Sequence, residues 1–468
     1  MGIAGSGISA VALIAQAQGY QVSGCDLEPK SYYSKQLIKK KIKIASGHSP
    51  RHLKGADFLV ITPAVLGVEP PHPEIIEAKK KMPVMTWQEF MEKFLQKGKF
   101  VIAVAGTHGK GTTTAMAGLV LEKAGLKPTV EVGGLVPQWQ ANALVGKSKY
   151  FVCEADEFNH NFLHYSPSVV IINNIEMDHP EFFKDFKAFL GSFRQLLRRQ
   201  VRPRILIVNL DNAGVRQLLK EEEDYLTKNR FQVIGYRLGG RFNFSLENEY
   251  QAIVKDLGER SSLFSVSLRS GASQKVAVEE LFRLRLPGIH NISNGLGVIA
   301  LARCLNLDFK HVRKVFENFA GIGRRLELLG QEKGIKVFDD YGYHPTAISA
   351  TIKAVKQKYS PQRVWAIFEP HQYSRVTLFQ KEFIKALGTA DKIIVTKIFP
   401  GREKQPKGIT GELLIKGLKP VRAKYIKDFD KVAQLVARET REGDVVIVFG
   451  AGKSYQLSQM ILDELKAG

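Results

Sequence analysis

A short glycine-rich segment with one lysine has the residue types of a phosphate-binding loop. Residues 104–116 read VAGTHGKGTTTAM, after a hydrophobic run that predicts a strand and before an expected helix. Backbone N–H groups and the positive end of a helix would face an anion there, and Lys110 can bridge terminal phosphates. The pattern predicts a nucleoside triphosphate site, with a plain tight turn as the alternative. Its residues are Gly106, Thr107, His108, Gly109 and Lys110.

The residue after this lysine is a glycine, where such loops normally place a hydroxyl group. That hydroxyl usually binds the magnesium ion that accompanies the triphosphate. Gly111 lacks it, so either Thr112, the next residue, or a water molecule must take its place. We therefore expect a working loop that holds Mg²⁺ less tightly than a threonine version would.

Polar residues that can bind magnesium follow two further predicted strands. They are Glu154, Asp156 and Glu157 after one strand, and Asn173, Asn174, Glu176, Asp178 and His179 after the other. Strand ends beside a phosphate loop are where a doubly wound sheet binds ligands. We expect two or three of these residues to contact a metal ion and the rest to be solvated.

Other polar groups lie towards the C-terminus. Asn291 and Asn294 are three residues apart and share a helix face, where they either read a nucleobase or cap the helix; taken alone, capping is favoured. Arginine and histidine at later strand ends suit recognition of phosphate or carboxylate. These later residues are Arg324, Arg325, Asp339, Asp340, Tyr341, His344, His371 and Arg375.

The chain opens on a second glycine pattern. MGIAGSGISAVA leads into an expected helix, and a predicted strand then ends at Asp26. This order is typical of the βα turn of a dinucleotide-binding domain. Almost nothing precedes Gly2, where the first strand of such a domain is expected.

The elements that must position these groups form an α/β protein of several domains. With 468 residues the chain exceeds one ordinary core. Buried-type strands alternate with helices, which predicts parallel sheets, and we divide the chain into domains at 1–95, 96–320 and 321–468. Alternating patterns over 226–285 predict an antiparallel β insert.

The amino-acid composition argues against nucleic-acid binding, a membrane span and a cysteine-based site. The formal charge is +22, but the lysines are dispersed along helical stretches, which favours anionic small substrates over nucleic acid. No apolar run reaches the roughly 20 residues of a membrane span, so we expect a cytoplasmic protein. Cys25, Cys153 and Cys304 form no CxxC pair, and the spacing predicts neither disulfides nor a thiolate zinc site.

Over essentially its whole length the sequence resembles the Mur ligases, the ATP-dependent amide ligases of peptidoglycan synthesis. The resemblance implies a Rossmann-like N-terminal domain, a central P-loop ATPase-like domain and a Rossmann-like C-terminal domain. The matching stretches are GIAGSGISAVA, GYQVSGCD, GTHGKGTTTAM, EADE, NIEMDH, GIHNISN, GIGRRLELLG, DDYGYHPTAI, FEPHQYSR, FPGREK and GAGKSY.

The resemblance also implies roles for particular residues. Gly5, Ser6, Gly7 and Asp26 would bind the UDP part of the substrate. ATP would contact the loop from Gly106 to Thr112, together with Asn291, Asn294, Arg325 and Asp340. Glu154 and His179, with Thr112 in place of the missing hydroxyl, would bind Mg²⁺. His344, His371 and Arg375 would complete the catalytic site, with His344 as one candidate acceptor of the amine proton.

The implied activity is ligation of L-alanine to the carboxylate of UDP-N-acetylmuramate through an acyl phosphate, by a monomer or weak homodimer. L-Alanine as the acceptor is favoured by the stretches FEPHQYSR and GAGKSY. A recycled tripeptide as the acceptor is favoured by the stretch NNIEMDHPEFFKDFKAF. Ala4, Tyr343 and Gln372 depart from the family pattern, as Gly111 does, and keep open a homologue that binds the UDP-sugar without ligating it. A nucleic-acid-binding ATPase is a further alternative, without a recognisable binding module.

Overall fold

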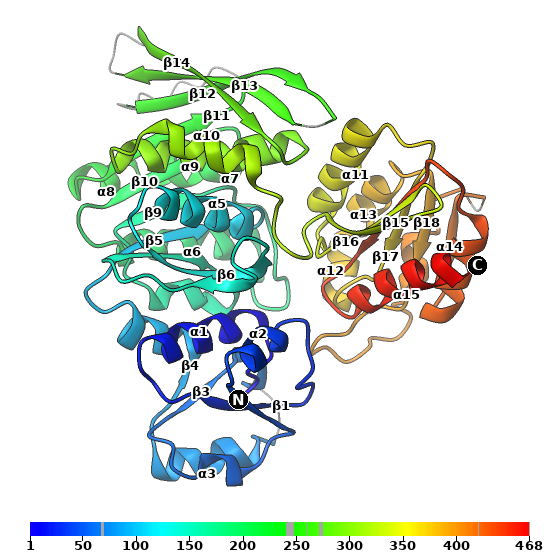
Figure 1. Cartoon of the computed structure of the whole chain (residues 1–468), viewed down its shortest axis with the longest axis horizontal. Helices are drawn as coiled ribbons and strands as arrows, with labels where there is room; N and C mark the ends of the chain where they lie inside the picture. The colour runs from blue at the N-terminus through cyan, green and yellow to red at the C-terminus, as the bar shows by residue number, and fades with distance from the viewer. Residues whose placement is uncertain (67–69, 240–247, 260, 271–274, 420, 468) are drawn as a thin grey trace.

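The computed structural model describes residues 1–66, 70–239, 248–259, 261–270, 275–419 and 421–467. We refer to residues 1–95, 96–320 and 321–468 as the N-terminal, central and C-terminal domains. Figure 1 shows the cyan-to-green central domain above the blue N-terminal domain, with the yellow-to-red C-terminal domain to their right, each built of helices and strands. The α/β class predicted from the sequence is confirmed.

The N-terminal domain contains two short parallel sheets, β1-β2 and β3-β4. The first residues of the chain lie between them, because the Gly2 N–H donates to the Cys25 carbonyl (2.8 Å) and the Thr62 N–H donates to the Met1 carbonyl (3.2 Å). Its elements are α1 (Ser6–Ala17), β1 (Ser23–Asp26), α2 (Ser34–Lys39), β2 (Lys43–Ser46), η1 (Pro50–Leu53), β3 (Leu59–Ile61), η2 (Pro63–Val65), α3 (Pro73–Lys81), β4 (Val84–Thr86), α4 (Trp87–Phe90) and η3 (Met91–Leu95).

The central domain is built on one long sheet with the order β14-β13-β12-β11-β10-β9-β5-β8-β6-β7. Every pair from β12 to β6 is parallel, so the carboxyl ends of these strands share one edge. Its elements are β5 (Phe100–Ala105), α5 (Lys110–Lys123), β6 (Thr129–Val136), β7 (Ala141–Leu144), β8 (Tyr150–Ala155), η4 (Phe158–His164), β9 (Val169–Ile172), α6 (Phe186–Arg199), β10 (Ile205–Asn209), α7 (Ala213–Glu221), α8 (Glu223–Lys228), β11 (Gln232–Arg237), β12 (Asn248–Leu257), β13 (Ser262–Ser270), β14 (Lys275–Leu284), α9 (Ile289–Cys304) and α10 (Phe309–Asn318).

The predicted antiparallel insert over 226–285 is wrong in its first part. Strand β11 pairs in parallel with β10, and its last four residues are buried, so it extends the parallel sheet. Antiparallel pairing begins only between β12 and β13 and continues to β14. The alternating pattern belongs to these later strands alone; residues 240–247, 260 and 271–274 of the predicted insert lie outside the described residues.

The C-terminal domain has a six-stranded sheet with the order β15-β16-β20-β17-β18-β19 and an apolar core on each face. The four strands predicted there are present, and β15 and β19 add the two edges. Its elements are β15 (Glu327–Glu332), β16 (Ile335–Asp340), α11 (Pro345–Tyr359), β17 (Val364–Phe368), α12 (Tyr373–Leu378), α13 (Gln380–Leu387), β18 (Lys392–Val395), η5 (Gly411–Leu414), β19 (Ala423–Tyr425), α14 (Phe429–Glu439), β20 (Val445–Phe449) and α15 (Ser454–Ala467).

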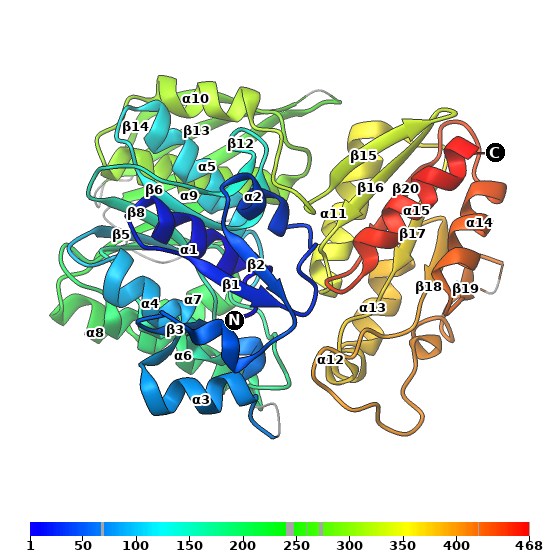
Figure 2. The ribbon, with the colours of Figure 1, turned by 60° about the horizontal axis from the view of Figure 1, so that its bottom comes forward.

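The C-terminal domain lies beside the other two domains in both views, with α11 on the side that faces the central domain (Figure 2). Glu28 of the N-terminal domain also contacts it, through a salt bridge to Lys453 at 3.0 Å. None of the described helices combines the length and apolar character needed to cross a bilayer.

Candidate active site

The glycine-rich loop joins β5 to α5 and is held by the segment that follows β9. The Thr107 hydroxyl donates to the Glu176 carbonyl (2.9 Å) and accepts from the Glu176 N–H (3.0 Å). The His108 N–H donates to Asn174 Oδ1 at 2.8 Å, and Asn174 Nδ2 donates to the His108 carbonyl at 3.1 Å. These reciprocal bonds fix the shape of the loop in advance of any phosphate.

Gly109 of this loop touches the start of α9. It has a φ of +80°, and a Cβ there would lie 2.3 Å from Asn294 Oδ1, so a larger residue is excluded. The asparagine pair does not cap α9, because the N-cap residue is Gly288 and Asn291 Nδ2 donates to the Pro287 carbonyl at 2.7 Å. The capping interpretation is therefore wrong, and contact of the two asparagines with adenine stays a prediction.

Lys110 is half-buried at the start of α5. Its Nζ donates to Glu157 Oε2 at 2.9 Å and to the Gly106 carbonyl at 2.7 Å. Burial disfavours the lysine charge, but the carboxylates of Glu157 and Asp156 outweigh it and raise the pKa of Lys110. The loop therefore presents a cation that remains charged at neutral pH.

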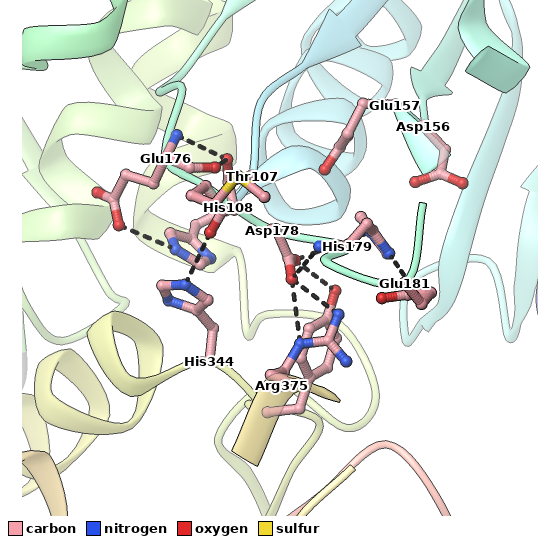
Figure 3. A network of polar contacts seen from close by, with 12 residues as sticks. Thr107, His108, Asp156, Glu157, Glu176, Asp178, His179, Glu181, His344 and Arg375 are labelled. Carbon is pink, nitrogen blue, oxygen red and sulfur yellow. Dashed lines mark hydrogen bonds and ion pairs between the residues drawn. The ribbon is translucent and has the colours of Figure 1, made fainter. Parts of the chain in front are cut away.

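Three residues beside this lysine are arranged to hold a cation (Figure 3). Asp156, Glu157 and His179 each offer one ligand atom, and these atoms lie within 4.8 Å of one another. Glu157 Oε1 is buried and has no hydrogen-bond partner among the described residues. Burial works against the charge of His179, but Asp178 and Glu181 raise its pKa to about 9.

Glu154 lies apart from that cluster, next to Gly111. Its Oε1 accepts the Gly133 N–H at 2.5 Å, and a Cβ on Gly111 would lie 2.8 Å from this oxygen and 2.8 Å from Ile322 Cδ1. The Glu154 side chain thus occupies space that a side chain at position 111 would take. Thr112 is half-buried in the first turn of α5. Metal binding by Glu154 and Thr112 stays a prediction.

A buried ion pair joins the C-terminal domain to the segment after β9. Arg375 donates to Asp178 Oδ1 from Nη2 at 2.7 Å and from Nε at 3.1 Å, and both side chains are 1 % exposed. The Tyr343 hydroxyl donates to the other carboxylate oxygen at 3.2 Å, and His371 Nδ1 lies 3.1 Å from Arg375 Nη1. Although burial opposes ionisation, His179 and Arg375 hold the pKa of Asp178 well below its usual range.

His344 also lies at this domain boundary. Its Nδ1 accepts the Thr346 N–H at the start of α11 (3.3 Å), and its Nε2 lies 3.3 Å from the Met177 carbonyl. The ring packs against that of His108 with centroids 4.7 Å apart, and burial lowers the pKa of His344 to about 4. Both ring nitrogens are therefore engaged in contacts, and this arrangement does not support His344 as the acceptor of an amine proton.

The two arginines that follow α10 have different surroundings. Arg324 pairs with Asp339 at 2.9 Å, with both side chains buried in the C-terminal domain. Arg325 places its guanidinium 5.0 Å from the centre of the Tyr341 ring. Asp340 is buried, and its carboxylate accepts two backbone N–H groups. ATP binding by Arg325 and Asp340 stays a prediction.

The N-terminal glycine segment lies at the start of α1, where Gly5 is the N-cap residue and Ser6 and Gly7 are in the first turn; no strand is assigned to residues 1–5. Asp26 Oδ2 accepts the Ala4 N–H at 2.9 Å and so connects the end of β1 to this segment. Asn142 of the central domain donates to the Ser6 carbonyl at 2.6 Å. Binding of a UDP group by residues 5–7 and Asp26 stays a prediction.

Family models match almost the entire chain: "Mur ligase family, catalytic domain" over residues 1–99, "Mur ligase middle domain" over 104–302 and "Mur ligase, glutamate ligase domain" over 324–452. A UDP-N-acetylmuramate–L-alanine ligase of Caldicellulosiruptor saccharolyticus is 34 % identical, and the alignment covers 99 % of this chain and 98 % of that one. Its counterpart in Aquifex aeolicus is 35 % identical, with 99 % and 97 % covered. The chain belongs to the Mur ligase family.

Solved structures of Mur ligases have the same architecture. The UDP-N-acetylmuramate–alanine ligase MurC of Thermotoga maritima gives a TM-score of 0.80 at 25 % identity, over 100 % of this chain and 98 % of that one. A murein peptide ligase of Psychrobacter arcticus gives 0.72 at 25 % identity, over 99 % and 97 %. The three-domain Mur ligase fold predicted from the sequence is confirmed.

Two residues at which this Mur ligase departs from the family pattern contribute to the domain contact. Tyr343 donates to Asp178, and Gln372 Oε1 accepts from Arg375 Nη1. The sequence predicts Asp178 only as one of several candidate magnesium ligands, and it indicates no contact of Asp178 with another domain. The sequence feature that could have identified Asp178 as a functional residue is its position after β9, at the same sheet edge as the phosphate loop.

A carboxyl group of this Mur ligase should make its stability depend on pH. Glu369 is 2 % exposed, and burial raises its pKa from 4.5 to about 7. At this group the folded state therefore binds more protons than the unfolded state between these values, so the contribution of Glu369 to stability should fall as pH rises from 4.5 to about 7 and stay level above. Glu369→Gln should remove this contribution to the pH dependence and stabilise the protein by roughly 1–3 kcal/mol at pH 8.

Urea unfolding at pH 5 and pH 8 measures the effect, with the exposed Glu223 replaced by glutamine as the matched control. An equal pH dependence in wild type and Glu369→Gln would contradict the assignment.

Proposed function

We propose that this Mur ligase joins L-alanine to the carboxylate of UDP-N-acetylmuramate with consumption of ATP, in the cytoplasm, as a monomer or weak homodimer. The observation that carries the proposal is the ion pair between Lys110 of the phosphate-type loop and the buried Glu157, with the Asp156, Glu157 and His179 cluster beside it. The relatives at 34 % and 35 % identity support the choice of alanine as acceptor.

The site suits phosphoryl transfer to a carboxylate. The substrate carboxylate attacks the γ-phosphorus of ATP, the bond to ADP breaks, and an acyl phosphate forms. Anion attacking anion is costly unless the developing charge is neutralised. Lys110 supplies a positive charge at the loop, and the start of α5 adds its N–H groups. The amine of alanine then attacks the acyl carbon, phosphate leaves, and an amide remains.

The residues beside Lys110 fit the magnesium ion that this chemistry implies. A buried, unpartnered Glu157 oxygen within a set of two carboxylates and one imidazole is a donor arrangement that a divalent cation would satisfy. Asp156, Glu157 and His179 would hold the ion, with Glu154 and Thr112 as further predicted ligands. Bound there, Mg²⁺ would neutralise phosphate charge.

The domain contact supports a role in excluding water from the acyl phosphate. The segment that holds the phosphate loop through Glu176 also carries Asp178, which pairs with Arg375 of the C-terminal domain. Docking of that domain is therefore mechanically connected to the loop. An undocked domain would leave the acyl phosphate open to hydrolysis.

Phosphate release from ATP and Mg²⁺ with UDP-N-acetylmuramate tests the proposal, with L-alanine, other amino acids, a tripeptide or no acceptor, and product masses read by mass spectrometry. Turnover that requires L-alanine and yields the alanyl product is expected. Turnover only with the tripeptide would assign the chain to the recycling reaction, which the likeness to a murein peptide ligase keeps as the second candidate. UDP-sugar binding without turnover would indicate a degenerate homologue.

Position 111 should control the magnesium requirement. In Gly111→Thr the new Cβ would lie 2.8 Å from both Glu154 Oε1 and Ile322 Cδ1, so the ends of these two side chains must shift, and the added hydroxyl supplies a metal ligand. We expect the Mg²⁺ concentration for half-maximal activity to fall several-fold. Gly111→Val is the matched control, because it has the same branched shape without the oxygen. An equal Mg²⁺ requirement in both variants would count against the hydroxyl as the cause.

A further inference from the structure

The N-terminal domain contains a group of side chains of the types that bind metal ions, away from the phosphate loop. Cys25 Sγ lies 3.2 Å from His48 Nδ1 and 3.3 Å from Glu74 Oε1. One ligand atom from each of the three residues lies within 4.8 Å of the others. We propose that Cys25, His48 and Glu74 bind a zinc-class divalent cation.

The spacing of the three atoms agrees with such an ion. Zinc bonds of about 2.3 Å to sulfur and about 2.0–2.1 Å to nitrogen or oxygen, at tetrahedral angles, place neighbouring ligand atoms about 3.5 Å apart. The two separations from Cys25 Sγ are 3.2 and 3.3 Å, so the side chains need only small movements. A thiolate with an imidazole selects zinc-class ions over magnesium.

The surroundings of the three side chains suit an ion with three protein ligands and a fourth coordination position that is open to water. Cys25 and Glu74 are each 1 % exposed, whereas His48 is half-buried. His52 Nδ1 is buried, has no hydrogen-bond partner within the described part of the chain, and lies 3.7 Å from Glu74 Oε2. The Ser49 N–H donates to the same oxygen at 2.9 Å and orients it. His52 can support the carboxylate, as groups around metal ligands commonly do, and a water can complete the coordination.

An ion at this place would connect three segments of the chain that have only a small apolar core between them. Cys25 is on β1, His48 follows β2, and Glu74 is in the first turn of α3. The apolar cluster between these elements is small: Met1, Cys25, Leu53, Leu59, Ile61, Ile75 and Ala78. Small cores are commonly reinforced by a metal ion, so Zn²⁺ would stabilise this domain. The cysteine spacing did not predict the group because residues 25, 48 and 74 meet only in the fold.

Metal binding to the full chain tests the proposal, in excess Mg²⁺ so that the carboxylates beside Lys110 do not compete. We expect one Zn²⁺ per chain by competition with a chromophoric chelator, and a thiolate-to-metal absorption band when Co²⁺ replaces it. Cys25→Ser should weaken Zn²⁺ binding by at least about 100-fold, remove the Co²⁺ band and abolish the rise in Tm that Zn²⁺ produces. Cys304→Ser, at the end of α9, is the matched control and should change none of these.

Glu74→Gln keeps an oxygen for the Ser49 N–H, and it should weaken Zn²⁺ binding while the domain stays folded. It replaces Cys25→Ser as the deciding variant if that protein does not fold. Absence of the Co²⁺–thiolate band in wild type, or Zn²⁺ binding that neither variant weakens, would overturn the proposal and leave the three residues as a hydrogen-bonded network only.

Discussion

Lys110→Met should lower kcat/KM for the ligation of L-alanine by about 10²–10³-fold, the range found when one preorganised donor to a developing charge is removed. Methionine keeps the length and apolar stem of lysine but lacks the charge. The remaining Glu157 carboxylate would then lie buried without its cation, since Lys110 Nζ is its partner at 2.9 Å. Losing one partner of a buried pair costs about 3–5 kcal/mol, so the variant should also unfold more easily.

Initial rates over a range of ATP concentrations and urea unfolding measure the two effects separately. The double variant Lys110→Met/Glu157→Gln removes both charges and should regain most of the lost stability while ligation stays low. Activity within tenfold of wild type in the folded single variant would contradict the role of Lys110 in phosphoryl transfer.

Local patterns predicted the parts of this site that lie within one βα unit. The loop from Gly106 to Lys110 follows β5 and precedes α5, as its glycines and flanking hydrophobic run indicated. The choice among nearby carboxylates was not predictable. Glu157 contacts Lys110, whereas Glu154 accepts a hydrogen bond from the Gly133 N–H. Glu157 is followed by a sharp turn, in which Asn159 and His160 of η4 have positive φ values.

Contacts between domains could not be predicted from the sequence, for a different reason. Asp178 and Arg375 are 197 positions apart, and nothing in either local pattern encodes how the domains pack. His344 shows the same difficulty, because its position at the start of α11 is predictable but its contact with Met177 is not. The error over β11 arose because a short strand buried in a parallel sheet and a strand of an antiparallel insert differ only weakly in sequence.

The Asp178–Arg375 pair should determine whether ATP hydrolysis stays coupled to ligation. Arg375→Met removes the arginine partner of the buried Asp178 and leaves it only the Tyr343 hydroxyl and the neighbouring His179, so docking of the C-terminal domain should weaken by several kcal/mol. We expect alanyl product to fall by about 100-fold, while phosphate release falls less, because water reaches the acyl phosphate when the domain is undocked.

The ratio of phosphate to alanyl product, measured in the same reaction, reports this uncoupling. Asp178→Asn separates two explanations. If Arg375 acts through the ion pair, this variant should raise the ratio as Arg375→Met does; if Arg375 acts only on phosphate, Asp178→Asn should leave the ratio unchanged. Arg363→Met is the matched control, because Arg363 pairs with Asp444 at 2.6 Å within the C-terminal domain. It should lower stability without changing the ratio, since that pair does not join two domains.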